Sequence, residues 1–217
     1  MMAVAASISH HGALVVLSAP SGTGKTTVAR HLVETIPSLV ASVSYTTRPR
    51  REHERDGVDY SFLDRTSFQA MARADRFLEW AEIYGHLYGT GREATESVLA
   101  RGDDLLLVID VQGARWVRKR QPGALFIFLM PPSYDVLLRR LHARGTESSG
   151  TEVQRLQVAR EEIRAWSEYD YLIVNDSLEA TWRAAESVIR AHRQTRSRMA
   201  ARAKAIASTF PSPSLLL

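Results

Sequence analysis

The sequence predicts an α/β fold in which helices cover both faces of a parallel β-sheet, with a small β-rich insertion. Short apolar runs without polar alternation recur along the chain at 13–17, 105–109 and 125–130. Such runs are typical of strands buried on both faces, and helical patterns separate them. The stretch 48–92 differs, because it is rich in charged and aromatic residues and alternates in short pieces. We therefore expect one main sheet and one inserted subdomain.

The predicted elements alternate along the chain. The strands of the main sheet are expected at 13–18, 39–44, 105–109, 125–130 and 172–174. The helices most clearly indicated lie at about 26–35, 134–144 and 178–201. The polar stretch 144–155 contains Gly145 and Gly150, which predicts a mobile loop between two helices.

Composition limits the class of protein. The chain has 217 residues, of which 45% are hydrophobic and 24% charged, enough to build a sizeable core. The absence of cysteine excludes disulfides and thiolate metal sites. No apolar run approaches the roughly 20 residues that cross a bilayer, and residues 1–11 lack the basic start of a secretory signal. These features predict a cytoplasmic protein without a membrane partner.

Charge is concentrated near the C-terminus. The net charge is +4, and residues 183–204 carry seven bases and one acid. No aromatic interleaving or recognition motif accompanies these bases, so we interpret the segment as a solvated helix face and expect no nucleic-acid partner.

A phosphate-binding loop follows the first predicted strand. It reads Ala19-Pro20-Ser21-Gly22-Thr23-Gly24-Lys25-Thr26-Thr27 and leads into a helix, the context that a P-loop requires. Its glycines let backbone N–H groups face the phosphates of a nucleoside triphosphate, and the helix start adds its dipole. Lys25 is expected to reach the β and γ oxygens, and the Thr26 hydroxyl to reach Mg²⁺.

Three arginines follow the second predicted strand, where ligands bind at the carboxyl end of a parallel sheet. Arg48 and Arg51 are three residues apart and stiffened by Pro49, so they could hold one phosphate from two sides. The alternative is a solvated basic turn.

Seven motifs taken together resemble guanylate kinase over about 14–176. They read APSGTGKTT, SVSYTTRPRR, DGVDYSF, FLEWAEIYGHLYGT, IDVQGA, RLHARGTE with the later QRL, and EYDYLIVND. The resemblance implies a P-loop kinase core, a GMP-binding subdomain at 48–92 and an arginine-bearing lid at 144–155. It further implies phosphoryl transfer from ATP to GMP in purine nucleotide metabolism, with Mg²⁺ as cofactor.

The same resemblance implies roles for single residues. The GMP phosphate would be held by Arg48, Arg51, Tyr60 and Tyr88. The guanine would be surrounded by Ser44, Glu79, Thr90 and Asp110. Catalysis would depend on Lys25 and on the lid arginines Arg144 and Arg155, while Asn175 would line the adenine site. A carboxylate at Glu79 suits guanine because it can accept from both N1–H and the exocyclic amine, paired donors that adenine lacks.

The predicted kinase domain covers 12–205, with core segments 12–47, 93–143 and 156–205 and flexible tails at 1–11 and 206–217. Val108 stands where many family members have an acidic residue, so any role of that carboxylate is missing or is carried by Asp110.

Two other functions are possible for a chain with a P-loop. A P-loop kinase for another phosphorylated small molecule would lack the guanine-contacting set, yet Ser44, Glu79 and Thr90 are present. A non-catalytic guanylate-kinase-like interaction module would have lost P-loop or lid residues, and these are also present. The sequence leaves open whether the chain is a monomer or a homo-oligomer, and whether dGMP is accepted beside GMP.

Overall fold

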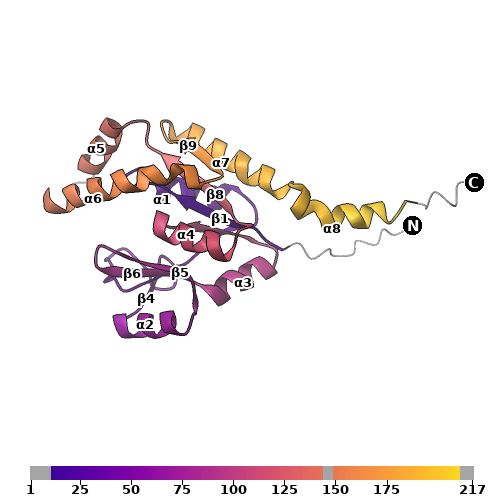
Figure 1. The fold of residues 1–217 in the computed structure, drawn as a ribbon, viewed down its shortest axis with the longest axis horizontal. Helices are drawn as coiled ribbons and strands as arrows, with labels where there is room; N and C mark the ends of the chain where they lie inside the picture. Colours follow the sequence, from indigo (N-terminus) through magenta and orange to yellow (C-terminus); the bar gives the residue numbers. More distant parts are fainter. Residues whose placement is uncertain (1–10, 144–148, 211–217) are drawn as a thin grey trace, which may run out of the picture.

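The computed structural model describes residues 11–143 and 149–210, with the backbone alone for 143 and 149–155. Within these residues, five parallel strands form the main sheet in the order β2-β7-β1-β8-β9 (Figure 1). The strands are β1 (Leu14–Ser18), β2 (Leu39–Ala41), β7 (Asp104–Val108), β8 (Leu125–Met130) and β9 (Tyr171–Val174). The predicted parallel sheet is confirmed, although its second strand ends at Ala41 instead of residue 44.

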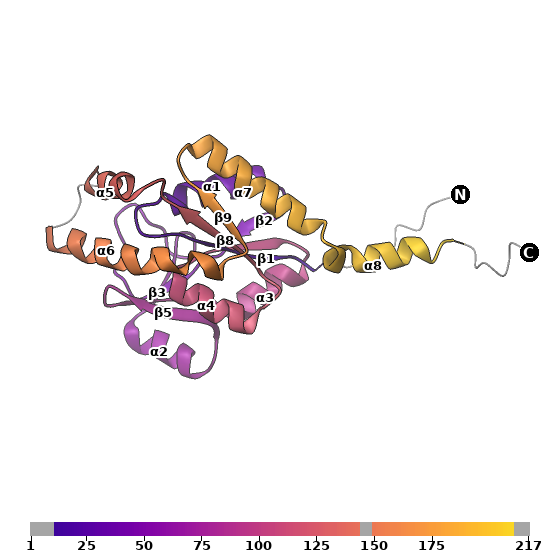
Figure 2. The same cartoon turned by 45° about the horizontal axis from the view of Figure 1, so that its top comes forward.

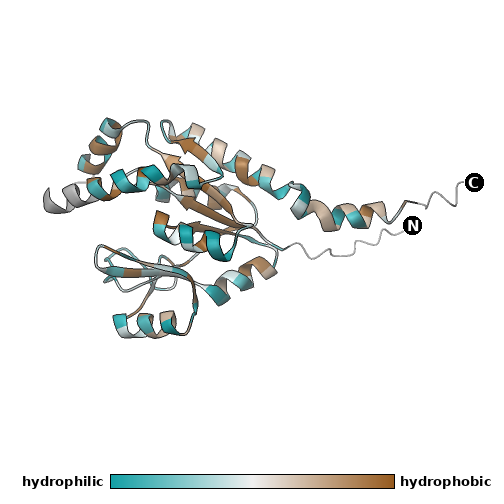
Figure 3. Cartoon of the chain, viewed as in Figure 1, coloured by the Kyte–Doolittle hydropathy of each residue, from teal (hydrophilic) through white to brown (hydrophobic). Residues whose placement is uncertain are grey.

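Helices cover both faces of this sheet. On one face lie α1 (Lys25–Thr35) and α7 (Leu178–Arg193), and on the other lie α3 (Arg92–Ala100) and α4 (Val111–Arg120). Alternate residues of β1 enter the two cores, since Val15 packs in the cluster with α1 and Val16 in the cluster with α4. Figure 3 shows the apolar strands of the sheet lying among helices that carry both polar and apolar residues. Burial on both sides explains why these strands lack polar alternation.

A second sheet stands beside the first. Its order in the described chain is β4-β3-β6-β5, formed by β3 (Tyr45–Thr46), β4 (Ser61–Phe62), β5 (Phe77–Ile83) and β6 (His86–Gly91). Helix α2 (Arg65–Arg73) covers it, and Phe68 packs with Phe77 and Leu87. Strand β3 lies before residue 48, so the sheet begins upstream of the predicted insertion.

The prediction of a loop over 144–155 is wrong for residues 149–155. Helix α5 (Tyr134–Ala143) is followed by α6 (Ser149–Glu162), which continues into a 3₁₀ helix, η1 (Ile163–Glu168). Gly150 does not prevent helix formation, because most residues after it are good helix formers. Leu137 and Leu141 of α5 pack against Ala159 of α6, so the two helices form one arm beside the sheet (Figure 2).

The prediction of one helix over 178–201 is also wrong. The helix is interrupted after α7, which ends at Arg193, and α8 (Arg196–Ala207) then projects away from the sheet (Figure 2). Asp104, 2% exposed, lies at this break and accepts a hydrogen bond from Arg193 Nε at 2.7 Å, while the Arg198 guanidinium lies 3.8 Å away. The break thus brings two bases of the C-terminal segment to one buried carboxylate. Helix α8 takes in residues 206–207 of the predicted tail, whereas 211–217 fall outside the description. No described helix has the length and apolar character needed to span a membrane.

Candidate active site

The phosphate loop joins β1 to α1, as predicted. Gly22 and Gly24 have φ values of +86° and +97°, a region that L side chains rarely adopt. At Gly24, the residue that precedes α1, a Cβ would also lie only 2.9 Å from Asn175 Nδ2. Because the first N–H groups of a helix have no acceptor within it, this turn offers donors to an anion.

Two side chains hold the loop from behind. Asn175 is buried, and its amide donates to the Thr23 carbonyl at 2.5 Å while accepting from the Thr181 hydroxyl at 2.9 Å. Arg140 donates to the carbonyls of Thr23 and Asn175 at 3.4 and 3.0 Å. Asn175 therefore stabilises the loop in this structure, and its contact with adenine stays a prediction.

Lys25 begins α1 and points toward the end of β7. Its ammonium donates to the Ile109 carbonyl at 3.0 Å. Burial lowers the pKa of Lys25, and the charges of Glu162 and Asp110 oppose that shift. Thr26 and Thr27 are exposed on the same helical turn, so the Thr26 hydroxyl is accessible.

Glu162, the last residue of α6, was not identified from the sequence. Its Oε2 accepts from the Ser21 N–H of the phosphate loop at 3.2 Å. Burial raises the pKa of Glu162, while the neighbouring Lys25 counteracts this. No local pattern marks this residue, because its partner lies 141 positions away in the chain.

The structure brings together three of the residues expected around guanine. Glu79 on β5 faces Thr90 on β6, whose hydroxyl donates to Glu79 Oε1 at 2.5 Å. Asp110 caps α4 by accepting from the Gly113 N–H at 2.8 Å. A Cβ at Gly113 would lie 2.6 Å from Glu79 Oε2 and 3.3 Å from Asp110 Oδ1, so the helix start presses closely on both carboxylates.

The electrostatics of this cluster are unusual for a carboxylate. Glu79 is only 5% exposed, and burial raises its pKa to about 7, against the Thr90 hydrogen bond and with the help of the Asp110 charge. A buried carboxylate that keeps one oxygen beside another carboxylate is suited to a ligand with hydrogen-bond donors. Val108, the last residue of β7, packs against the core that contains α1 and adds no carboxylate to this cluster.

The residues expected at the GMP phosphate are only partly assembled. The Arg48 guanidinium lies 5.5 Å from the centre of the Tyr60 ring, and the rings of Tyr60 and Tyr88 are 6.1 Å apart. Arg51 is exposed. Ser44 is half-buried just before β3, and its carbonyl accepts from the Ser61 N–H.

Glu54 is a second residue that sequence reasoning missed. It is 7% exposed and accepts from Arg48 at 2.6 Å and from the Arg51 N–H at 2.9 Å. Burial alone would raise the pKa of Glu54, but these bonds hold it below its ordinary value. Glu54 thus orients Arg48 toward the tyrosines. The only sequence signal for this role is an acidic residue close to the arginines of a charged segment.

The two halves of the site meet at the end of β7. Ile109 contacts Lys25 of the phosphate loop, and the next residue, Asp110, lies beside Glu79. This is the carboxyl edge of the parallel sheet, where ligands of such folds bind. Of the predicted lid arginines, Arg144 lies outside the described residues, and Arg155 is on α6 with its side chain outside the description.

Comparisons with known proteins identify the family to which this chain is similar. The family model described as guanylate kinase matches residues 11–192. The guanylate kinase of Carboxydothermus hydrogenoformans is 46% identical over 85% of this chain and 90% of its own length, and that of Desulfitobacterium hafniense is 47% identical over 78% and 84%. The crystal structure of guanylate kinase from Anaplasma phagocytophilum superposes with a TM-score of 0.73 at 36% identity, covering 87% of this chain and 90% of that one.

Proposed function

This chain belongs to the guanylate kinase family and transfers the γ-phosphoryl group of ATP to GMP, and we propose that it does so between the phosphate loop and the Glu79 pocket. The observation that carries the proposal is the buried pair of Glu79 and Thr90, which lies next to Asp110 and across the end of β7 from Lys25. GMP requires a carboxylate that can accept from two donors of its base. ATP requires an ammonium beside a phosphate loop.

On the GMP side, Glu79 accepts from guanine N1–H and the exocyclic amine. Thr90, Asp110 and Ser44 complete the surroundings of the base. The phosphate is bound by Arg48 with Tyr60, Tyr88 and, after a rearrangement of its exposed side chain, Arg51. Before GMP binds, Glu54 already keeps Arg48 oriented, so less side-chain entropy is lost when GMP binds.

On the ATP side, backbone N–H groups of residues 19–27 surround the phosphates, and Lys25 exchanges its bond with Ile109 for the transferred phosphoryl group. The exposed Thr26 hydroxyl would supply a protein oxygen for Mg²⁺. Among the described residues, no group of three or more acidic or histidine side chains could hold a metal ion. When bound, Mg²⁺ neutralises charge on the phosphates.

The subdomains act as two moving parts around the core of 12–47, 93–143 and 156–205. The second sheet brings GMP, and the segment 144–155 brings Arg144 and Arg155 to the ATP phosphates. Closure aligns donor and acceptor and excludes water, which are the main needs of phosphoryl transfer. A cytoplasmic location is part of this proposal, and the assay below decides whether dGMP is accepted beside GMP.

A coupled assay of ADP formation tests the assignment, with GMP, dGMP, AMP, dTMP and UMP as acceptors. We expect turnover with GMP and at least a hundredfold lower kcat/KM with AMP, because adenine leaves the Glu79 carboxylate without paired donors. Equal use of AMP or UMP would overturn the pocket assignment. The alternatives of another small-molecule kinase and of a non-catalytic module are not favoured by the family match.

A further inference from the structure

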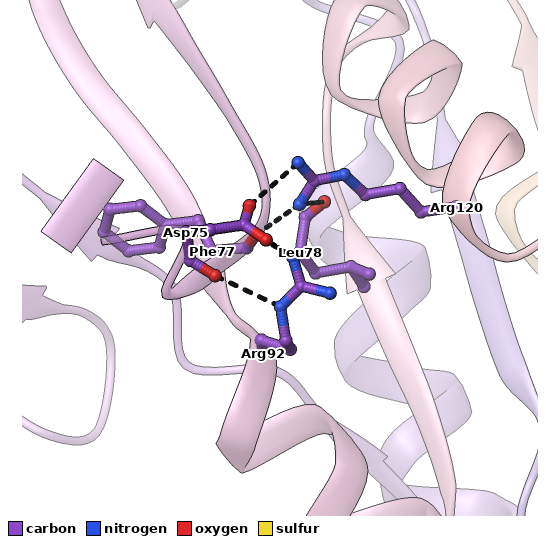
Figure 4. A network of polar contacts seen from close by, with 5 residues as sticks. All are labelled: Asp75, Phe77, Leu78, Arg92 and Arg120. Carbon is purple, nitrogen blue, oxygen red and sulfur yellow. Dashed lines mark hydrogen bonds and ion pairs between the residues drawn. The ribbon is translucent and has the colours of Figure 1, made fainter. Parts of the chain in front are cut away.

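A network of polar contacts lies behind the Glu79 pocket, at the junction of the two sheets (Figure 4). Asp75, in the turn between α2 and β5, forms ion pairs with Arg92 at 2.6 Å and with Arg120 at 2.9 Å. Arg92 is the first residue of α3 and Arg120 is the last of α4, so both partners come from helices of the main sheet. The network therefore ties the start of β5 to the core.

Arg120 contacts more than Asp75. One of its nitrogens donates to the carbonyls of Phe77 and Leu78 at 2.7 and 3.2 Å, the two residues before Glu79 (Figure 4). The same helix, α4, contacts the Glu79 side with its first turn through Asp110 and Gly113. Helix α4 thus contacts the start of β5 with both of its own ends, through Arg120 at its C-terminus and through Gly113 near its N-terminus, which lies close to the Glu79 carboxylate.

The strand is irregular where Arg120 binds. The pairing of β5 with β6 shifts between Phe77 and Glu79, so Leu78 is an extra residue in the ladder. Phe77 packs in the core of the second sheet, whereas Leu78 packs in the main core with Leu99 and Val117. This irregularity directs Leu78 and then Glu79 toward α4. Arg120 donates to the carbonyls of Phe77 and Leu78, the two residues at the register shift.

The conformation of Asp75 is uncommon for a residue with a side chain, and its carboxylate is engaged in both ion pairs. Asp75 has a φ of +51° and follows α2 at a position where glycine is favoured. The hydrogen bond from Arg120 is the largest cause that lowers the pKa of Asp75. A residue held in a strained conformation that binds two arginines is a candidate for a functional constraint.

Arg120 also closes a small space beside the pocket. A cavity of about 70 Å³ is lined by Asp75, Glu79, Trp80, Trp116 and Arg120, among others. Removal of the guanidinium would widen this cavity behind β5 and free the two carbonyls. Glu79 would then keep its hydrogen bond with Thr90 but lose the fixed position of its strand.

From these contacts we propose that Arg120, held by Asp75, is a positioning residue that sets the Glu79 carboxylate for two-point recognition of guanine. The inference rests on the proposed role of Glu79, and Arg120 itself touches no substrate. Its contribution is geometric, since a carboxylate displaced by a fraction of an ångström can still meet one donor but not two.

Inosine monophosphate distinguishes recognition through one donor from recognition through two, because it keeps N1–H and lacks the exocyclic amine. For Arg120→Ala we expect kcat/KM for GMP to fall roughly tenfold or more. The ratio of kcat/KM for GMP to kcat/KM for inosine monophosphate should fall by a similar factor. The KM for ATP should change less than about twofold, and GMP binding measured by calorimetry without ATP should weaken to the same extent as kcat/KM. Arg120→Lys, which keeps the charge but not the fork of donors, should lie between Ala and wild type.

Arg76→Ala is the matched control. Arg76 joins the same turn to α3 through an exposed ion pair with Glu93 at 2.8 Å, and it should leave the ratio unchanged. Asp75→Gly serves if Arg120→Ala does not fold, because glycine relieves the positive φ while it removes the carboxylate; the ratio should fall without loss of stability. A folded Arg120 or Asp75 variant with the wild-type ratio and GMP affinity would refute the inference. A wild-type enzyme that does not prefer GMP would instead refute the assignment of Glu79.

Discussion

Replacement of Glu79 by glutamine separates the stability of the protein from its function. The pKa of Glu79 is about 7 in the folded protein against an ordinary value of 4.5. This difference corresponds to about 3 kcal/mol at 1.36 kcal/mol per pKa unit. Because the folded state binds the proton more tightly, stability falls as pH rises from about 4.5 to about 7, and the whole loss is present above pH 7. Glutamine cannot ionise, so it avoids this loss.

We therefore expect Glu79→Gln to be more stable than wild type at pH 8, by up to about 3 kcal/mol, with the difference shrinking toward zero near pH 4.5. The same variant should lose on the order of a hundredfold in kcat/KM for GMP, because its amide turns one acceptor toward two donors. Wild-type kcat/KM for GMP should itself decline below pH 7, where Glu79 becomes protonated.

Urea unfolding at pH 8 and pH 5, followed by circular dichroism, measures the stability difference. Glu82→Gln is the control, since Glu82 lies on the same strand, is about half exposed and pairs with Arg65 at 3.2 Å. Its effect should be below about 1 kcal/mol at either pH. A Glu79→Gln variant that is less stable at pH 8, or whose advantage does not depend on pH, would show that ionisation of the buried carboxylate does not cause the loss of stability.

Five further substitutions test the site. Lys25→Met should fold normally and lower turnover at least on the order of a hundredfold, and steady-state kinetics with near wild-type turnover would remove Lys25 from catalysis. Arg144→Ala and Arg155→Ala should each lower kcat more than they raise KM for ATP, whereas a pure KM effect would limit these residues to ATP binding. Glu54→Ala should raise KM for GMP roughly tenfold by freeing Arg48, and an unchanged KM in the same assay would argue against that role. Gly113→Ala should keep its melting temperature but reduce kcat/KM for GMP roughly tenfold, because its Cβ would lie 2.6 Å from Glu79 Oε2; wild-type kinetics would contradict this.

Local patterns predicted the parts of the molecule whose structure depends on near neighbours. The run at β1 is apolar throughout because Val15 and Val16 face different cores, and the glycines after it mark a phosphate loop. The contact of Arg193 with Asp104 beside the break was not predictable, because the two residues are 89 positions apart in the chain. The first turns of α6, residues 149–155, were predicted as a loop because Gly145 and Gly150 favour a loop, although good helix formers follow Gly150.

Site residues followed the same division. Glu79 and Thr90 stand in recognisable motifs, and the structure joins them by one hydrogen bond. Glu162 and Arg120 carry no motif, and each acts on a backbone group far away in the sequence, Ser21 in one case and Phe77 in the other. The shift in the β5 ladder is also invisible to a period-two pattern, since one extra residue leaves the alternation on either side intact.

The polar groups of the site are already paired within the protein before substrate binds. The pairs are Lys25 with the Ile109 carbonyl, the Ser21 N–H with Glu162, Arg48 with Glu54, and the Thr90 hydroxyl with Glu79. Each substrate contact must therefore replace or share a protein contact, so the net gain on ground-state binding is smaller than the number of contacts suggests. Charge that develops on the transferred phosphoryl group has no such competitor, because it exists only in the transition state. A site built in this way favours turnover over tight binding of either nucleotide.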